Sequence, residues 1–227
     1  MFIFGDSHAN ALKNAAASLG QPVHGGILGA GRDFNVAFYS RTGNDFRFAR
    51  AETHAVYQDY LRAAGVDTAA QLRMPILCLF GMNLHYLSRQ DVWAAFATRP
   101  RDPGQFLSGA VVRETTRAMI EGALRFYEDL RDMGHIVYGA LPPRRTPTIS
   151  TGSLPRIFLL LEDVVSEELA SRGVEVIDHR LWSLDSDGRL RPEFAHPDPA
   201  DVVHGSDLFG RQLLEQILAA HARRAGG

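Results

Sequence analysis

The chain has 227 residues, of which 45% are hydrophobic and 22% are charged, and its formal net charge at pH 7 is −2. This composition is typical of a globular domain, and the near-neutral charge argues against nucleic acid or an anionic membrane surface as a partner. Cys78 is the only cysteine, which excludes an intrachain disulfide and a cysteine-rich metal site. The length suits a single domain, residues 1–227, with a full-sized core.

Short apolar runs and segments with helical character alternate along the chain. The apolar runs predict buried strands at Met1–Phe4, Pro22–Leu28, Met74–Gly81, His135–Leu141 and Val174–Asp178. The segments between and after them predict helices at Ala9–Leu19, Glu52–Ala64, Val112–Met133, Arg156–Arg172 and Leu208–Ala222. This alternation indicates an α/β fold: a three-layer α/β/α sandwich, flavodoxin-like, with a parallel sheet of about five strands.

Three further segments do not fit this alternation. Apolar residues alternate on both sides of Thr42-Gly43-Asn44, which predicts a hairpin over residues 36–48. The segments 91–109 and 144–154 are rich in Pro, Gly or small polar residues and follow strands, so we expect them to shape a substrate pocket.

No signal peptide or run of about 20 apolar residues is visible, so we expect a cytoplasmic protein if Met1 is the start.

Reactive side chains occur where α/β sheets place functional groups, just after strands. Ser7 follows the first strand in "FGDSH", and Asn83 follows the third in "FGMN". Asp201 and His204 lie in "DVVH", before the last helix. Residues at i and i+3 face the same side of a helical turn, so the carboxylate can orient the imidazole toward Ser7. The set contains the nucleophile, base and acid of a serine hydrolase, although each motif alone is weak.

These three blocks, in this order, resemble those of the SGNH hydrolases, the GDSL-type esterases and lipases. The resemblance implies that Ser7 is the nucleophile, that Asp201 and His204 complete a catalytic triad, and that Asn83 donates to the oxyanion. The backbone amide of Ser7 is expected as a further donor, aided by the dipole of the following helix. The third block departs from the family pattern, because Leu84 follows Asn83 where an aspartate is usual.

The oxyanion-hole glycine is assigned to Gly29, which ends the strand-like "VHGGILG". Gly31 and Gly43 are the alternatives, although a glycine at position 43 is also what a hairpin turn requires. Three further residues are candidates for substrate binding, each with an ordinary structural role as the alternative: His8, Arg32 and His85.

The predicted activity is hydrolysis or transfer of an acyl ester through an acyl-serine intermediate, with no metal or other cofactor. The expected substrate carries a small acyl group on a carbohydrate or metabolite. Asp6-x-His8 is also the opening ligand pair of calcineurin-like metallophosphoesterases, so a metal-dependent phosphoesterase is one alternative. A non-catalytic binding domain of the same fold is the other.

Overall fold

The centre of the molecule is one parallel sheet. The computed structural model describes residues 1–34, 37–82, 95–97, 104–144 and 154–226. The sheet has five strands in the order β2-β1-β5-β8-β9, and every neighbouring pair is parallel. Its strands are β1 (Phe2–Gly5), β2 (His24–Ile27), β5 (Ile76–Leu79), β8 (Val137–Ala140) and β9 (Glu175–Ile177). All residues of β1, β5 and β8 are buried, as expected for a sheet covered on both faces.

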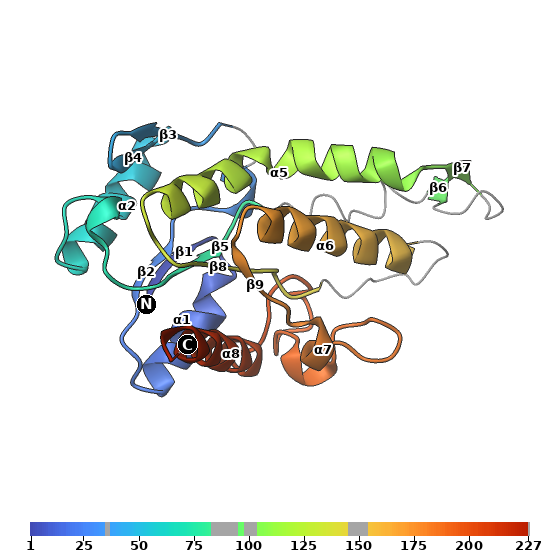
Figure 1. Ribbon diagram of the computed structural model, residues 1–227. Coiled ribbons are helices and arrows are strands. Elements are labelled where there is room, and N and C mark those ends of the chain that lie inside the picture. Colours follow the sequence, from blue (N-terminus) through green and yellow to red (C-terminus); the bar gives the residue numbers. More distant parts are fainter. Residues whose placement is uncertain (35–36, 83–94, 98–103, 145–153, 227) are drawn as a thin grey trace.

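Helices cover both faces of this sheet (Figure 1). One face carries α1 (Ala9–Ser18) and α8 (Asp207–Ala225), and the other carries α2 (Ala51–Ala63), α5 (Gly109–Asp132) and α6 (Leu154–Ser171). Alternate residues of each strand point to opposite faces, and the core accordingly divides into two clusters, one on each face. This arrangement confirms the predicted three-layer α/β/α sandwich with a parallel sheet of five strands.

The helices α1 and α8 pack unusually closely. Gly210 of α8 lies so near α1 that a Cβ atom on it would be 2.2 Å from the carbonyl oxygen of Ala11. Ser206 caps the start of α8, because its hydroxyl accepts a hydrogen bond from the amide of Phe209 at 3.3 Å. The close contact places the segment before α8 beside the start of α1, and so beside the end of β1.

The predicted hairpin is present as β3 (Tyr39–Thr42) and β4 (Asp45–Phe48), which pair antiparallel. Gly43 supplies the turn with φ of 62°, a conformation that glycine adopts without a steric penalty. The rings of Phe46 and Phe126 pack with centroids 4.5 Å apart, which holds the hairpin against α5.

Several short elements were not predicted, because one or two turns leave little periodicity to detect. They are η1 (Gly31–Phe34), η2 (Ala69–Gln71), α7 (Arg180–Ser183), η3 (Pro192–Phe194) and the small parallel pair β6 (Phe96–Ala97) and β7 (Gln105–Phe106). Residues 91–94, 98–103 and 145–153, which belong to the two expected pocket segments, lie outside the described residues.

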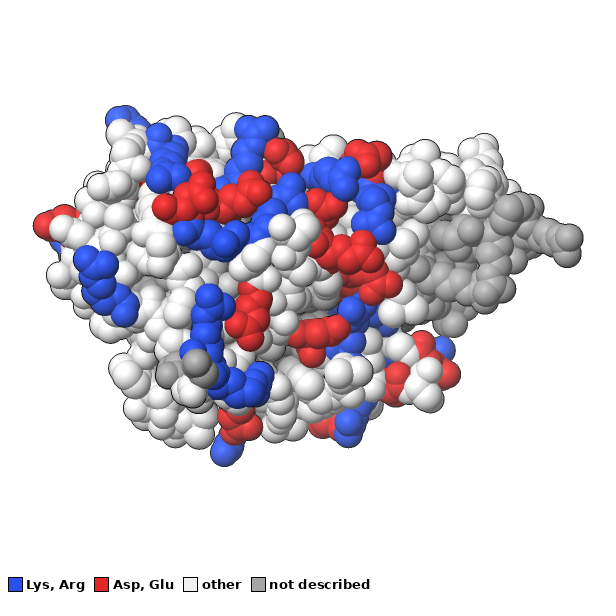
Figure 2. Space-filling view, viewed as in Figure 1, with Lys and Arg blue, Asp and Glu red and all other residues white. Residues whose placement is uncertain are grey.

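Charged side chains of both signs are interspersed over the face that carries α5 and α6 (Figure 2). Many of them form ion pairs, such as Arg117 with Glu168 at 2.6 Å and Arg113 with Glu167 at 2.5 Å, which join these two helices. Within the part of the chain that the structure describes, no helix is both long and apolar enough to cross a membrane.

Candidate active site

Ser7 lies two residues after β1, where the order of the sheet reverses. The strand next along the chain, β2, pairs with one edge of β1, and β5 pairs with the other. In open α/β sheets, ligands bind outside the carboxyl ends of the strands at such a switch point. The turn is held on both sides, because the amide of Leu28 donates to the Gly5 oxygen at 2.8 Å and the amide of Asp6 donates to the Leu79 oxygen at 3.3 Å.

Ser7, His204 and Asp201 form a continuous line of hydrogen-bonding side chains. His204 Nε2 is 2.8 Å from Ser7 Oγ, and His204 Nδ1 is 2.7 Å from Asp201 Oδ2. An ionised carboxylate only accepts, so the Asp201 contact places the imidazole proton on Nδ1 and leaves Nε2 to accept from the Ser7 hydroxyl. The structure thus brings together three residues that are up to 197 positions apart in sequence.

The physical reason for the Asp201–His204 contact differs from the predicted one. Residues 201–204 are not helical, and they form bends at Val203 and His204 ahead of α8. Asp201 shapes these bends itself, because its Oδ1 accepts from the backbone amides of Val203 at 3.1 Å and His204 at 3.0 Å. An aspartate that binds amides two and three residues ahead is a common turn former. The same carboxylate therefore fixes the backbone and the imidazole of His204.

Hydrogen bonding keeps Asp201 ionised. Burial alone would raise the pKa of this carboxyl, but the hydrogen bonds from the His204 ring and from the amides of His204 and Val203 outweigh burial. The net result lowers the pKa of Asp201 from 3.8 to about 2. The carboxylate therefore stays charged throughout the range in which an imidazole ordinarily changes its protonation.

Asp6, directly before Ser7, is a buried carboxyl group. Burial raises its pKa from 3.8 to about 7, against the opposing hydrogen bond from the His8 amide and the charge of His204. Its Oδ1 accepts from that His8 amide at 3.0 Å, and a Cβ on Gly31 would lie 3.3 Å from its Oδ2. Asp6 thus accepts a hydrogen bond within its own turn and packs against the loop after β2. Across the described ranges, no three His, Cys, Asp or Glu side chains are placed to hold a metal ion.

Two further histidines flank the His204 imidazole. The His8 ring centroid is 5.1 Å from that of His204, and the His196 ring centroid is 6.5 Å from it. His196 Nδ1 is also 3.8 Å from Asp201 Oδ2. His196 was not among the predicted site residues, and its place in the sequence, eight residues before His204, carries no recognisable signal.

The remaining predicted site residues lie apart from the Ser7–His204–Asp201 line or outside the described residues. Gly29 follows β2 and lies against Asp33, whose Oδ2 would be 3.1 Å from an added Cβ. Arg32 is exposed at the start of η1. Gly43 lies in the turn of the hairpin, with nothing within 4 Å of an added Cβ. Asn83 and His85 lie outside the described residues, in the gap between residues 82 and 95.

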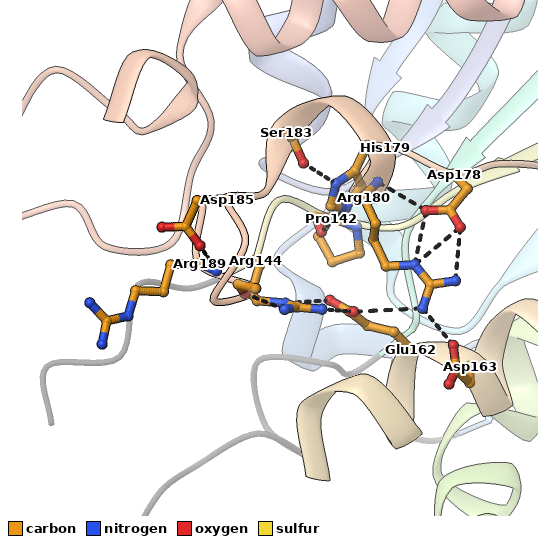
Figure 3. A network of polar contacts seen from close by, with 11 residues as sticks. Pro142, Arg144, Glu162, Asp163, Asp178, His179, Arg180, Ser183, Asp185 and Arg189 are labelled. Carbon is orange, nitrogen blue, oxygen red and sulfur yellow. Dashed lines mark hydrogen bonds and ion pairs between the residues drawn. The ribbon is translucent and has the colours of Figure 1, made fainter. Parts of the chain in front are cut away.

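A second polar network lies beyond the carboxyl ends of β8 and β9 (Figure 3). Arg144 and Glu162 form a buried ion pair, with each side chain 5% exposed and Nε 3.0 Å from Oε1. His179 is fully buried, with Nε2 3.0 Å from the Pro142 oxygen and Nδ1 2.7 Å from Ser183 Oγ. Burial lowers the pKa of His179 from 6.5 to about 4, so it is neutral near pH 7. This network ties the segments after the two strands together.

Comparisons with known proteins match the fold and not the sequence. No family model matches the chain, and no curated protein matches its sequence. A crystal structure of an acetyl xylan esterase is similar over 96% of this chain and 98% of its own, at 12% identity and a TM-score of 0.50. A lipase/acylhydrolase from Enterococcus faecalis matches over 98% and 95%, at 17% identity and a TM-score of 0.44. An esterase from Pseudoalteromonas sp. matches over 100% and 98%, at 8% identity and a TM-score of 0.46. The likeness to the acetyl xylan esterase structure is one of fold alone, the three-layer α/β/α sandwich described above.

Proposed function

We propose that this protein is a serine hydrolase that cleaves a carboxylic ester through an acyl-serine intermediate. The observation that carries the proposal is the hydrogen-bonded line from Asp201 through His204 to Ser7. Three such groups at hydrogen-bond distance make a nucleophile, a base that accepts its proton and an acid that orients the base. Their position at the switch point of the sheet, together with the family resemblance of all three motifs, supports the same conclusion.

In the proposed reaction, His204 Nε2 accepts the Ser7 proton while Ser7 Oγ attacks the ester carbonyl. The imidazolium that forms is stabilised by the Asp201 carboxylate. His204 then protonates the departing alcohol, which leaves an acyl group on Ser7. Water then enters and gives a proton to His204 as its oxygen attacks the acyl carbonyl. The bond to Ser7 Oγ breaks, His204 returns the proton to Oγ and the acid leaves, so the enzyme returns to its starting state. A second alcohol in place of water would give acyl transfer through the same steps.

The oxyanion of the tetrahedral intermediate needs hydrogen-bond donors near Ser7 Oγ. The Ser7 amide is one proposed donor, since it lies just ahead of α1, where the helix dipole favours negative charge. Asn83 and Gly29 are proposed as further donors from the family resemblance. In the sequence, Asn83 comes shortly after β5, directly after the described segment that ends at residue 82. The strand β5 pairs with β1, the strand that leads to Ser7.

The proposed substrate is an ester of a small acyl group with a carbohydrate or metabolite. A similar structure is an acetyl xylan esterase, which makes acetyl esters a sensible first class to assay. The side chains proposed to contact the substrate are His8, which packs against His204, together with Arg32 and His85.

The proposal is tested by hydrolysis of p-nitrophenyl acetate and of acetylated sugars. Ser7→Ala and His204→Ala should each remove most of kcat, and Asn83→Ala should lower it roughly 10²–10³-fold. Ser18→Ala is the matched control, because Ser18 lies at the end of α1 and its hydroxyl donates to the Ala15 oxygen of the same helix at 2.8 Å. Wild-type activity in Ser7→Ala would disprove the proposal.

A further inference from the structure

His196 is fixed beside the loop that carries Asp201 and His204. Its backbone amide donates to the His204 oxygen at 3.2 Å, and Ala195 and Gly205 form an isolated antiparallel bridge. The amide of Asp201 donates to the Asp198 oxygen at 3.0 Å. The backbone of residues 195–205 is thus a closed loop with His196 at its base.

The His196 side chain takes part in the same loop through one ring nitrogen. Nδ1 accepts a hydrogen bond from the amide of Asp198 at 3.2 Å, so the proton of the neutral ring is on Nε2. That same Nδ1 is 3.8 Å from Asp201 Oδ2, the oxygen that His204 Nδ1 approaches to 2.7 Å. The Nδ1 atoms of two imidazole rings therefore lie near one carboxylate oxygen. While His196 is neutral, His204 Nδ1 donates to that oxygen and His196 Nδ1 accepts from the Asp198 amide instead.

We infer that His196 is a positioning residue whose neutral form reserves Asp201 for His204 and whose protonated form competes for it. The inference rests on the proposed function. When Nδ1 takes a proton it can no longer accept from the Asp198 amide and becomes a donor. Its nearest described carboxylate oxygen is Asp201 Oδ2, and a charged hydrogen bond there is stronger than a neutral one. His204 then loses part of the contact that holds its tautomer and orientation.

The titratable groups next to His196 are Asp201, Asp198 and His204. The Asp201 carboxylate has one oxygen, Oδ2, 3.8 Å from His196 Nδ1, and the Asp198 carboxylate accepts a hydrogen bond from the amide of Ala200 at 2.9 Å. The opposing group is His204, at a centroid distance of 6.5 Å, because two imidazolium rings repel. His8 also packs against His204, with ring centroids 5.1 Å apart.

The chain offers a matched pair of variants. An asparagine side chain readily accepts from the amide two residues ahead, so His196→Asn keeps the bond to Asp198 without a group that can be protonated. His196→Ala removes both the bond to the Asp198 amide and the group that can be protonated. We expect His196→Asn to keep kcat within about twofold of wild type at pH 8, as replacement of one acceptor by another requires. In His196→Ala, kcat at pH 8 should fall several-fold because the bond to Asp198 is lost. His196→Asn keeps that bond, so it should restore kcat relative to His196→Ala.

The decisive readout is the acid limb of log(kcat/KM) against pH. Protonation of His204, the proposed base, by itself gives this limb a slope of 1. In the wild type, protonation of His196 weakens the His204–Asp201 contact as well, so the limb should be steeper than 1. In His196→Asn the slope should stay at 1. Identical limbs in the two proteins, or equal kcat at pH 8 in His196→Asn and His196→Ala, would overturn the inference.

Proton NMR separates this inference from the proposed function, because it needs no turnover. The downfield resonance of the His204 Nδ1 proton, bonded to Asp201, should weaken on acidification of the wild type and persist in His196→Asn. The same behaviour in both proteins contradicts the competition at Asp201. A wild type that hydrolyses no ester but shows this difference would contradict only the proposed function.

Discussion

Asp6→Asn is predicted to make the protein more stable than wild type at alkaline pH. The buried Asp6 carboxyl has its pKa raised from 3.8 to about 7, which means that the folded state favours the protonated form. A raised pKa gives stability that is fully present below 3.8 and is lost as the pH rises to the folded-state value. Asparagine is neutral at every pH and its Oδ1 can still accept from the His8 amide.

The magnitude follows from the separation of the two pKa values. Each pH unit between them corresponds to about 1.4 kcal/mol, so the wild type loses about 4 kcal/mol of unfolding free energy in total. About 2 kcal/mol of this loss falls between pH 5.5 and 8.5, because the remainder has already occurred at lower pH. The difference in unfolding free energy between Asp6→Asn and wild type should therefore rise by about 2 kcal/mol over that interval.

Urea denaturation at a series of pH values measures this difference directly. Asp185→Asn is the control, because Asp185 is exposed and accepts from the amide two residues ahead at 2.9 Å, as Asp6 does at 3.0 Å. The control should show little pH dependence relative to wild type. A constant difference between Asp6→Asn and wild type from pH 5.5 to 8.5 would refute the reasoning about Asp6.

Three other variants test the packing, the buried network and the triad. Gly210→Ala should cost roughly 1–3 kcal/mol in urea denaturation, because its Cβ would lie 2.2 Å from the Ala11 oxygen, while Gly109→Ala, with open space around it, should cost little. The pKa of His179 is lowered from 6.5 to about 4, so the stability that the neutral ring gives above pH 6.5 is lost as the pH falls toward 4. This loss is about 3 kcal/mol of unfolding free energy in the wild type, and His179→Gln should lose less unfolding free energy over the same range. Asp201→Asn should lower kcat toward p-nitrophenyl acetate roughly 10⁴-fold, since asparagine cannot stabilise the imidazolium, and a loss below tenfold would contradict its assigned role.

The sheet could be predicted from sequence because each core strand is a short apolar run bounded by glycine, proline or polar residues. Met1–Phe4 and Met74–Gly81 are examples, and the observed strands β1 and β5 lie within or next to them. Ser7 could be assigned to the functional edge of the sheet because it directly follows a strand, whereas Asp201 and His204 lie ahead of the last helix and were linked to Ser7 only by the order of the motifs and the family resemblance. Their assigned roles remain a proposal.

Other features depend on tertiary contacts that no local pattern reveals. Arg144 and Glu162 look like surface residues in the sequence, and only the packing of α6 against the segment after β8 buries them as a pair. His196 has no motif, and its proximity to Asp201 arises from the loop that closes ahead of α8. The bends at Val203 and His204 differ from the expected helical turn because the Asp201 carboxylate binds the amides of both residues.

The most direct test of the central claim is the reaction of the purified protein with a fluorophosphonate, followed by intact mass and peptide mapping. An activated serine should give one adduct, on Ser7, with or without EDTA, and His204→Ala should give none. Ser7→Ala is the control for labelling elsewhere in the chain. A folded wild-type protein that forms no adduct, or forms one on another residue, would contradict the proposal that Ser7 is the nucleophile.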